Sequence, residues 1–273
     1  MDRGGFVIKL IMSDMDGTLL DENGCLPEGF DAMMAKLKER GVTFAPASGR
    51  QYYSLLESFP AYADDFIFIA ENGTMVKQHG KELFSSPISR AFAYEVLAEG
   101  MKLQDIFCVY CGKKDAYIHT SQDKKEYQDE LLKYYTHNDV VEDFHQVDDE
   151  PIKISFFDKN GRASQSIYPY MKQFEGRMQV VRSSDFWVDI MSFGINKGVA
   201  IQQIQHKLGI TPMECAAFGD YLNDAEMMSS VYYSFAMGNA HHKIKEIARY
   251  ETKTNEEHGV LAGIQRLMDE GLI

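Results

Sequence analysis

Two aspartates stand one residue apart directly behind an apolar run, in the stretch LIMSDMDGTLLDENG at residues 10–24. The carboxylates of Asp14 and Asp16 repel each other and prefer water, so their place at the end of a buried strand calls for a chemical reason. Three interpretations are open: a calcium-binding loop, an acidic turn, and a site where one carboxylate attacks while the other transfers a proton.

The calcium interpretation fails on spacing. An EF-hand loop needs a glycine at its sixth position and a glutamate at its twelfth, and a helix before it. Counted from Asp14, those positions hold Leu19 and Cys25, and the preceding segment has the pattern of a strand. The choice therefore lies between an acidic turn and a catalytic pair.

Two short polar motifs follow later in the chain. The stretch ASGR supplies a hydroxyl at Ser48, a close backbone approach at Gly49 and a fixed cation at Arg50. In the stretch NKG, Asn196 is a helix cap, and Lys197 falls in the first helical turn, where the helix dipole disfavours a cation. Each motif taken alone is also compatible with an ordinary turn or a solvated lysine.

A third motif, GDYLND at residues 219–224, gathers Asp220, Asn223 and Asp224 at a strand-to-helix turn. Helix capping explains one acidic residue there but not the cluster. In open parallel sheets, ligand sites form at the carboxyl ends of the strands, so we expect these motifs to converge.

The elements needed to position these motifs alternate between strand and helix, which indicates a parallel sheet built from strand-helix-strand units. We expect strands at residues 6–13, 42–48, 66–70, 215–219 and 232–237, and helices at 27–41, 196–209, 223–230, 241–250 and 259–271. The Asn-Gly pair in ENGT, residues 71–74, favours a hairpin turn after the third strand.

Between residues 83 and 191 the sequence pattern changes. Segments rich in aromatic residues, with alternating apolar and polar positions, are separated by polar segments of helical character. This pattern predicts an inserted α+β domain with an antiparallel sheet. Its expected strands are 106–110, 116–120, 152–157, 178–184 and 186–191, with a helix at 121–135. The predicted division is a discontinuous core, residues 1–82 and 192–273, and an insert, residues 83–191.

Composition and charge narrow the partners. A formal net charge of -13 disfavours binding to nucleic acid or to an anionic membrane surface. The N-terminal stretch has neither a signal peptide nor a membrane span, and the scattered cysteines suit the cytoplasm. Cys108 and Cys111 lie in a strand-like stretch, where residues three apart face opposite sides, so we interpret them as packing thiols.

The motifs DxDGT, Ser-Gly, Lys and GDxxND occur here in that order, and together the chain resembles the haloacid dehalogenase-like (HAD) superfamily of phosphotransferases. The insert lies between the second and third motifs, which is similar to the type IIB capped branch, the Cof-type phosphatases. The resemblance implies an α/β fold: a Rossmannoid parallel-sheet core with an inserted α+β cap of the C2B type.

The resemblance also implies roles for the motif residues. Asp14 would be the nucleophile that forms an aspartyl-phosphate, and also a Mg²⁺ ligand together with the Asp16 backbone carbonyl and the Asp220 carboxylate. Asn223 and Asp224 would complete or hold the metal shell. Asp16 would give a proton to the leaving oxygen and then take one from the attacking water.

The remaining motif residues are implied to bind the phosphate or to shape the site. Ser48 and Lys197 would bind the transferring phosphoryl group, and the further phosphate-site residues are Thr18, which bonds locally to fix the loop, Gly49, Arg50, Asn223 and Asn239. Substrate choice should fall to the cap, where Asp185, Trp187 and Asp189 lie near the exit from the insert. Trp187 either packs inside the cap or stacks on a sugar or ring.

The predicted function is a Mg²⁺-dependent phosphatase, a phosphoric monoester hydrolase, acting on small phosphorylated metabolites such as sugar phosphates. Two alternatives stay open: a phosphomutase of the phosphomannomutase type, and a sensor that binds a phosphometabolite without turnover. A dehalogenase is disfavoured, because its reaction has no leaving oxygen that would need Asp16 as an acid. The physiological ester and the oligomeric state are not determined by the sequence.

Overall fold

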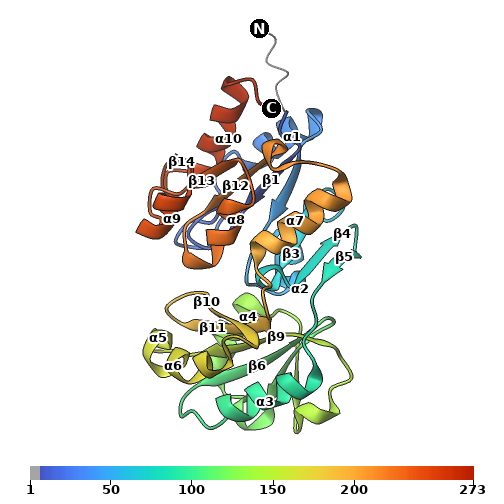
Figure 1. The fold of residues 1–273 in the computed structure, drawn as a ribbon, viewed down its shortest axis with the longest axis vertical. Coiled ribbons are helices and arrows are strands. Elements are labelled where there is room, and N and C mark those ends of the chain that lie inside the picture. Colours follow the sequence, from blue (N-terminus) through green and yellow to red (C-terminus); the bar gives the residue numbers. More distant parts are fainter. Residues whose placement is uncertain (1–6) are drawn as a thin grey trace.

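The computed structural model describes residues 7–273, in two parts stacked end to end. Figure 1 shows the core with the C-terminus at its far end, and the inserted cap below it. The first predicted strand began at residue 6, which lies outside the described residues. In the part of the chain that is described, no helix combines the length and apolar character needed to cross a membrane.

Five parallel strands form the core sheet, in the order β14-β13-β12-β1-β2. Within it, Ser13 at the end of β1 lies opposite both Phe218 and Pro46. The loops that follow these three strands therefore leave the sheet at the same edge, as the parallel arrangement predicts. The strands are β1 (Leu10–Ser13), β2 (Thr43–Pro46), β12 (Cys215–Gly219), β13 (Tyr233–Ala236) and β14 (Tyr250–Glu251).

Helices cover both faces of this sheet, which is why its inner strand β1 is apolar on both sides. Ile11 of β1 packs in a cluster with side chains of α1 and α10, whereas Leu10 and Met12 pack against α7, α8 and α9 on the other face. The core helices are α1 (Phe30–Glu39), α2 (Tyr52–Ser58), α7 (Lys197–Leu208), α8 (Ala225–Ser229), α9 (His242–Ile247) and α10 (Gly259–Asp269).

A three-stranded antiparallel unit extends the core toward the cap: β3 (Ile67–Ala70), β4 (Met75–Gln78) and β5 (Lys81–Ser85). A parallel bridge between Ala47 and Ile69 joins it to the end of β2. The predicted hairpin turn between β3 and β4 is confirmed, and Glu71 and Asn72 at its tip both have left-handed backbone, with φ of 53° and 55°.

The cap is a six-stranded sheet in the order β10-β11-β9-β6-β7-β8. It is antiparallel, as predicted, except that β7 and β8 are parallel because α4 (Lys125–Tyr134) crosses over between them. Helices α3 (Arg90–Gly100), α5 (Ala163–Ser166) and α6 (Tyr168–Met171) pack on one face, and α4 packs on the other. The strands are β6 (Phe107–Gly112), β7 (Ala116–His119), β8 (Asn138–Val141), β9 (Pro151–Phe157), β10 (Met178–Arg182) and β11 (Trp187–Ser192).

Local details differ from the sequence-based expectation. The helix predicted to reach residue 250 ends at Ile247, because the chain there turns back to add β14 beside β13. The boundary predicted between residues 82 and 83 cuts β5, whose ladder with β4 runs on to Ser85, and β11 likewise continues past residue 191 to Ser192.

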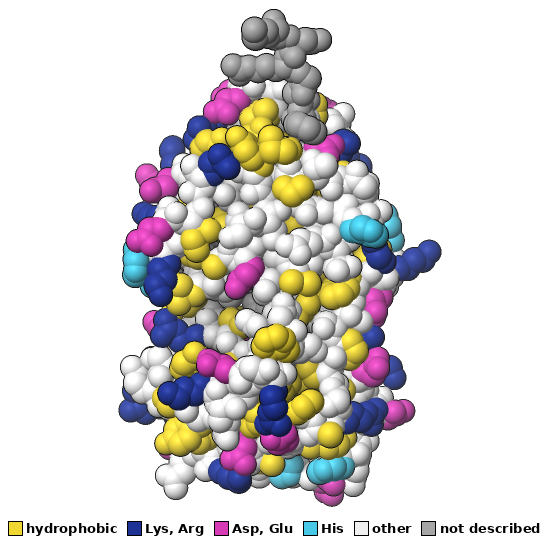
Figure 2. All heavy atoms as spheres, viewed as in Figure 1, with side chains coloured by type: hydrophobic (Ala, Val, Ile, Leu, Met, Phe, Trp, Pro, Cys, Tyr) yellow, Lys and Arg dark blue, Asp and Glu magenta, His cyan; other side chains and the backbone are white. Residues whose placement is uncertain are grey.

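Cys108 and Cys111 confirm their interpretation as packing thiols. Both lie on β6, and their side chains belong to the two different clusters on opposite faces of the cap sheet. Burial raises the pKa of the Cys108 thiol to about 12, so this thiol stays protonated and unreactive. On the surface, Figure 2 shows lysine and arginine side chains scattered among acidic ones on the face drawn there.

One close helix contact fixes how α7 meets α8. A Cβ atom placed on Gly198 would lie 2.5 Å from the Glu226 carbonyl oxygen, which is backbone and has little room to yield. We therefore expect Gly198→Ala to lower the free energy of unfolding by about 1–3 kcal/mol, as overpacking does, measured by urea denaturation. Gln203→Ala, on the exposed face of the same helix, is the control and should change stability by no more than about 0.5 kcal/mol.

Candidate active site

The loop after β1 makes a sharp turn that brings the two aspartates to the sheet edge. Gly17 has a φ of 78°, and a Cβ there would lie 2.6 Å from Asp220 Oδ2, so both its conformation and its surroundings require glycine. The Thr18 hydroxyl donates to Asp220 Oδ1 at 2.8 Å, a contact across the sheet edge and not the local bond expected. The DxDGT loop and the GDxxND loop therefore hold each other.

Three carboxylates converge where these loops meet. One oxygen from each of Asp14, Asp220 and Asp224 lies within 4.8 Å of the others. The oxygens of Asp224 already accept hydrogen bonds, Oδ2 from the backbone N–H groups of Asp220 and Tyr221 and Oδ1 from Lys197. Both oxygens of Asp224 are therefore engaged within the protein, whereas Asp14 and Asp220 each accept one side-chain hydrogen bond, on Oδ1.

The electrostatics of this cluster fit a divalent cation. Burial, more than any other cause, raises the pKa of Asp14 well above its usual value. Burial and the neighbouring Asp224 raise the pKa of Asp220 to about 7. These shifts arise because three carboxylates share a single lysine in a buried place. An oxygen-only donor set with an excess of negative charge is what Mg²⁺ prefers.

Lys197 is the lysine in question, and its interpretation as a solvated surface residue is wrong. Its side chain is 0% exposed, and Nζ lies 2.5 Å from Asp14 Oδ1 and 2.7 Å from Asp224 Oδ1. Burial disfavours the charged form, but the two aspartates outweigh it and raise the pKa of Lys197, so it stays a cation. Asn196 caps the helix as predicted, since its side chain accepts from the Val199 N–H.

The loop after β2 places Ser48 and Arg50 on the other side of Asp14. Ser48 is buried, and its hydroxyl accepts from the Arg50 N–H at 3.2 Å. The Arg50 guanidinium grips both oxygens of Asp16, with Nε at 3.1 Å and Nη2 at 2.5 Å. The sequence did not indicate this bidentate pair, which fixes the direction of the Asp16 carboxylate.

The two predicted asparagines lie in different places. Asn223 lines the cavity described next, and its amide donates to Asn72 Oδ1 at 3.1 Å. Asn239 instead donates to the Gly17 carbonyl at 2.7 Å and accepts from the Asn255 N–H. It supports the turn of the DxDGT loop from behind and does not line that cavity.

A cavity of about 80 Å³ lies between the core loops and the cap. Core and cap contribute to it together, and Asp14 and Asp16 both open into it, as their spacing of two predicts. Its remaining lining residues are Ser48, Gly49, Tyr134, Tyr135, Lys153, Ser183, Ser184, Trp187, Asp189, Tyr221 and Asn223. A second cavity of about 370 Å³ shares Asn223 with it and reaches Lys197, between Arg182 of the cap and Glu226 of the core.

The cap residues named from the sequence separate in the structure. Trp187 is buried against Tyr134, Tyr135 and Phe157, as its packing interpretation predicts, and it also borders the smaller cavity. Asp189 is buried and lines that cavity, whereas Asp185 is exposed and lines neither cavity.

Other lining groups were missed by the sequence analysis. Tyr134, Lys153 and Ser183 come from separate cap elements, and no local motif marks them. Asn72 had a signal, since the Asn-Gly pair that predicted the turn also places its amide at the left-handed tip.

Comparison with known proteins agrees with this geometry. A family model described as haloacid dehalogenase-like hydrolase matches residues 11–264. The chain is 31% identical, over 96% of both chains, to an Escherichia coli protein named 5-amino-6-(5-phospho-D-ribitylamino)uracil phosphatase YbjI. It is 29% identical to the HMP-PP phosphatase of Klebsiella pneumoniae, over 87% of this chain and 86% of the relative.

A solved structure extends the comparison to the cap. The fold matches that of the HAD subclass IIB sugar phosphatase BT4131 with a TM-score of 0.80, at 20% identity, over 97% of this chain and all of that chain. The fold is therefore that of a HAD hydrolase core with a subclass IIB cap.

The chain belongs to the haloacid dehalogenase-like hydrolase family. The prediction of a Cof-type member is confirmed, and so is the enzyme class, a phosphoric monoester hydrolase, because the curated relatives are phosphatases.

The acidic cluster predicts a stabilising effect of Mg²⁺. A cation that binds only the folded chain raises its apparent stability by mass action, so millimolar MgCl₂ should raise the thermal unfolding midpoint of EDTA-treated protein. Asp220→Asn removes a carboxylate from the cluster and should abolish most of this increase. Asp148→Asn, at a fully exposed aspartate, should keep it. An equal increase in all three proteins would contradict a site at this cluster.

Proposed function

We propose that this protein is a Mg²⁺-dependent phosphatase that hydrolyses small phosphate monoesters through an aspartyl-phosphate on Asp14. The observation that carries the proposal is the convergence of Asp14, Lys197 and Asp220 beside a cavity that Asp16 also lines. Asp14 and Asp220, with the backbone carbonyl of Asp16, would hold Mg²⁺. That ion neutralises the charge between an anionic nucleophile and an anionic phosphate.

The side chains divide the remaining work. Lys197 Nζ donates a hydrogen bond to Asp14 Oδ1, so the lysine orients the nucleophile. The same ammonium group would contact the oxygens of the transferring phosphoryl group. Ser48, on the opposite side of Asp14, donates its hydroxyl to another of these oxygens. Both groups are buried and already positioned, so little reorganisation is needed during the reaction.

Arg50 and Asp16 exchange partners as substrate enters. In the free enzyme the guanidinium donates hydrogen bonds to both carboxylate oxygens of Asp16 and fixes their direction. A phosphate dianion competes for Arg50, and the released Asp16 carboxylate takes up a proton from solvent and then gives it to the leaving oxygen. The same carboxylate then takes a proton from the water that hydrolyses the aspartyl-phosphate.

The leaving group occupies the cap side of the smaller cavity, because Asp16 opens there. Aromatic and hydroxyl groups of the cap line that side, Tyr134, Ser183, Ser184 and Trp187, and they suit a polyol or sugar joined to a ring. The substrate to test first is 5-amino-6-(5-phospho-D-ribitylamino)uracil, after the name of the Escherichia coli relative, within a panel of sugar phosphates.

Replacing the nucleophile is the direct test of the mechanism. Asp14→Asn should reduce inorganic phosphate release from p-nitrophenyl phosphate by at least about a thousandfold, as loss of a covalent nucleophile does in other hydrolases. The parent enzyme should lose activity in EDTA and recover it with MgCl₂. Asp148→Asn serves as the control and should match the parent. Undiminished release by Asp14→Asn would overturn the aspartyl-phosphate route.

Replacing the acid should depend on the leaving group. Asp16→Asn removes general acid–base catalysis, which contributes about 10²–10⁴-fold. The loss in the first step should be smaller for p-nitrophenyl phosphate than for a sugar phosphate, because p-nitrophenolate departs without a proton. Pre-steady-state release of p-nitrophenol and of sugar measures this step. Equal losses with both esters would argue against proton donation by Asp16.

A further inference from the structure

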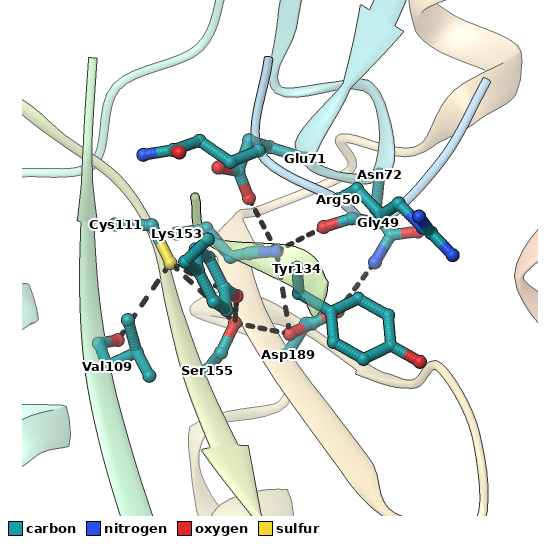
Figure 3. Close-up of polar contacts among 12 residues, drawn as sticks. Gly49, Arg50, Glu71, Asn72, Val109, Cys111, Tyr134, Lys153, Ser155 and Asp189 are labelled. Atoms are coloured by element: carbon teal, nitrogen blue, oxygen red, sulfur yellow. Dashed lines mark hydrogen bonds and ion pairs between the residues drawn. The ribbon is translucent and has the colours of Figure 1, made fainter. Parts of the chain in front are cut away.

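A lysine on strand β9, in the middle of the cap sheet, contacts two segments of the core beside the proposed active site. Lys153 lies on β9, and its side chain is 1% exposed. Its Nζ donates to the Gly49 carbonyl at 2.7 Å and lies 2.5 Å from Glu71 Oε2, both in the core. Figure 3 shows the Lys153 ammonium between Gly49, Glu71 and Asp189.

The two core groups that Lys153 contacts belong to segments that support each other. Gly49 stands between Ser48 and Arg50, the residues that the proposed mechanism places on the phosphoryl group. The hairpin tip holds this loop through its backbone, since the Asn72 N–H donates to the Ser48 carbonyl and the Glu71 N–H donates to the Arg50 carbonyl. Lys153 therefore bridges the loop and its support from the cap side.

A second cap residue continues the same contact. The Asp189 carboxylate accepts from the Asn72 amide at 2.6 Å and from the hydroxyls of Ser183 and Ser155, both at 2.5 Å. The other end of the Asn72 amide accepts from Asn223, in the GDxxND loop. The cap, the hairpin tip, the Ser48–Arg50 loop and the GDxxND loop are thus joined in one network of polar contacts.

The charges in this network depend on one another. Lys153 lies between two buried carboxylates, Glu71 of the core and Asp189 of the cap, with Nζ 3.8 Å from the Asp189 oxygen. Burial disfavours the ammonium, yet Asp189 and Glu71 outweigh it and raise the pKa of Lys153. Moving the cap away would separate Lys153 from Glu71, so this pair exists only in the closed arrangement of cap and core.

We propose that Lys153 is a positioning residue: it links closure of the cap to the position of the phosphoryl-binding loop, residues 48–50. By holding the Gly49 carbonyl and Glu71 from the cap side, it completes the positions of Ser48 and Arg50 only when the cap is closed. The site is then assembled by closure, which protects the reaction from water. This inference rests on the proposed function.

The test compares Lys153→Met with the parent enzyme on two esters, p-nitrophenyl phosphate and the best sugar phosphate of the panel. Because the affected loop binds the phosphoryl group, kcat/KM should fall at least tenfold on both esters and by similar factors. A residue that only contacted the leaving group would affect the sugar phosphate alone. Lys153→Arg retains the charge and should recover part of the loss.

The control is Lys113→Met. Lys113 also pairs between the two parts, with Glu82 of β5 at 3.5 Å and Glu150 of the cap at 3.1 Å, but it does not contact the catalytic loops. Its kcat/KM should stay within twofold of the parent. Circular dichroism and thermal unfolding establish that each variant is folded.

Defined results would overturn the inference. A folded Lys153→Met enzyme within twofold of the parent on p-nitrophenyl phosphate would do so, and so would equal losses in the Met and Arg variants. If Lys153→Met does not fold, Glu71→Gln replaces it, because this variant keeps the lysine and weakens its core anchor. It should then lose at least threefold on both esters, and unchanged values would overturn the coupling. A parent enzyme without phosphatase activity would instead refute the proposed function.

Discussion

The architecture of this protein depends on the charge of three aspartates held close together. Asp14, Asp220 and Asp224 gather at one sheet edge with a single lysine between them, and burial makes their mutual repulsion severe. Backbone N–H groups and Lys197 accommodate Asp224, and the Thr18 hydroxyl supports Asp220. The negative charge that remains suits a cation, which in the proposed mechanism lets the site accept a phosphate.

The parallel sheet makes this convergence possible. Because β1, β2 and β12 end level, three loops that are far apart in sequence leave the sheet at one edge. Left-handed glycine at position 17 lets two of these loops approach within contact of each other. The cap then closes the open side of the site through the hairpin tip at Glu71 and Asn72, which touches loops of the core and strands of the cap.

The local patterns of the sequence were informative where one segment decides the outcome. The apolar periodicity of α1, the cap of α7 at Asn196 and the Asn-Gly hairpin turn depend on neighbouring residues, and the structure has each of them. The sequence was less informative where a partner lies far along the chain. The short strand β14 is stabilised by its pairing with β13, and the parallel pairing of β7 and β8 depends on the crossover of α4.

The sequence by itself determined the family of this protein and supplied the motif residues of the proposed chemistry. The order and spacing of its acidic, hydroxyl and lysine motifs specify the loops that follow parallel strands, and hence the nucleophile, the acid and the cation site proposed here. Only the tertiary structure decided which acidic side chain each buried or partly buried cation pairs with. The pairs of Arg50 with Asp16, Lys197 with Asp14 and Lys153 with Glu71 join residues from 34 to 183 positions apart. Such pairs form only when folding brings together residues that are far apart in the chain, so no local pattern records them.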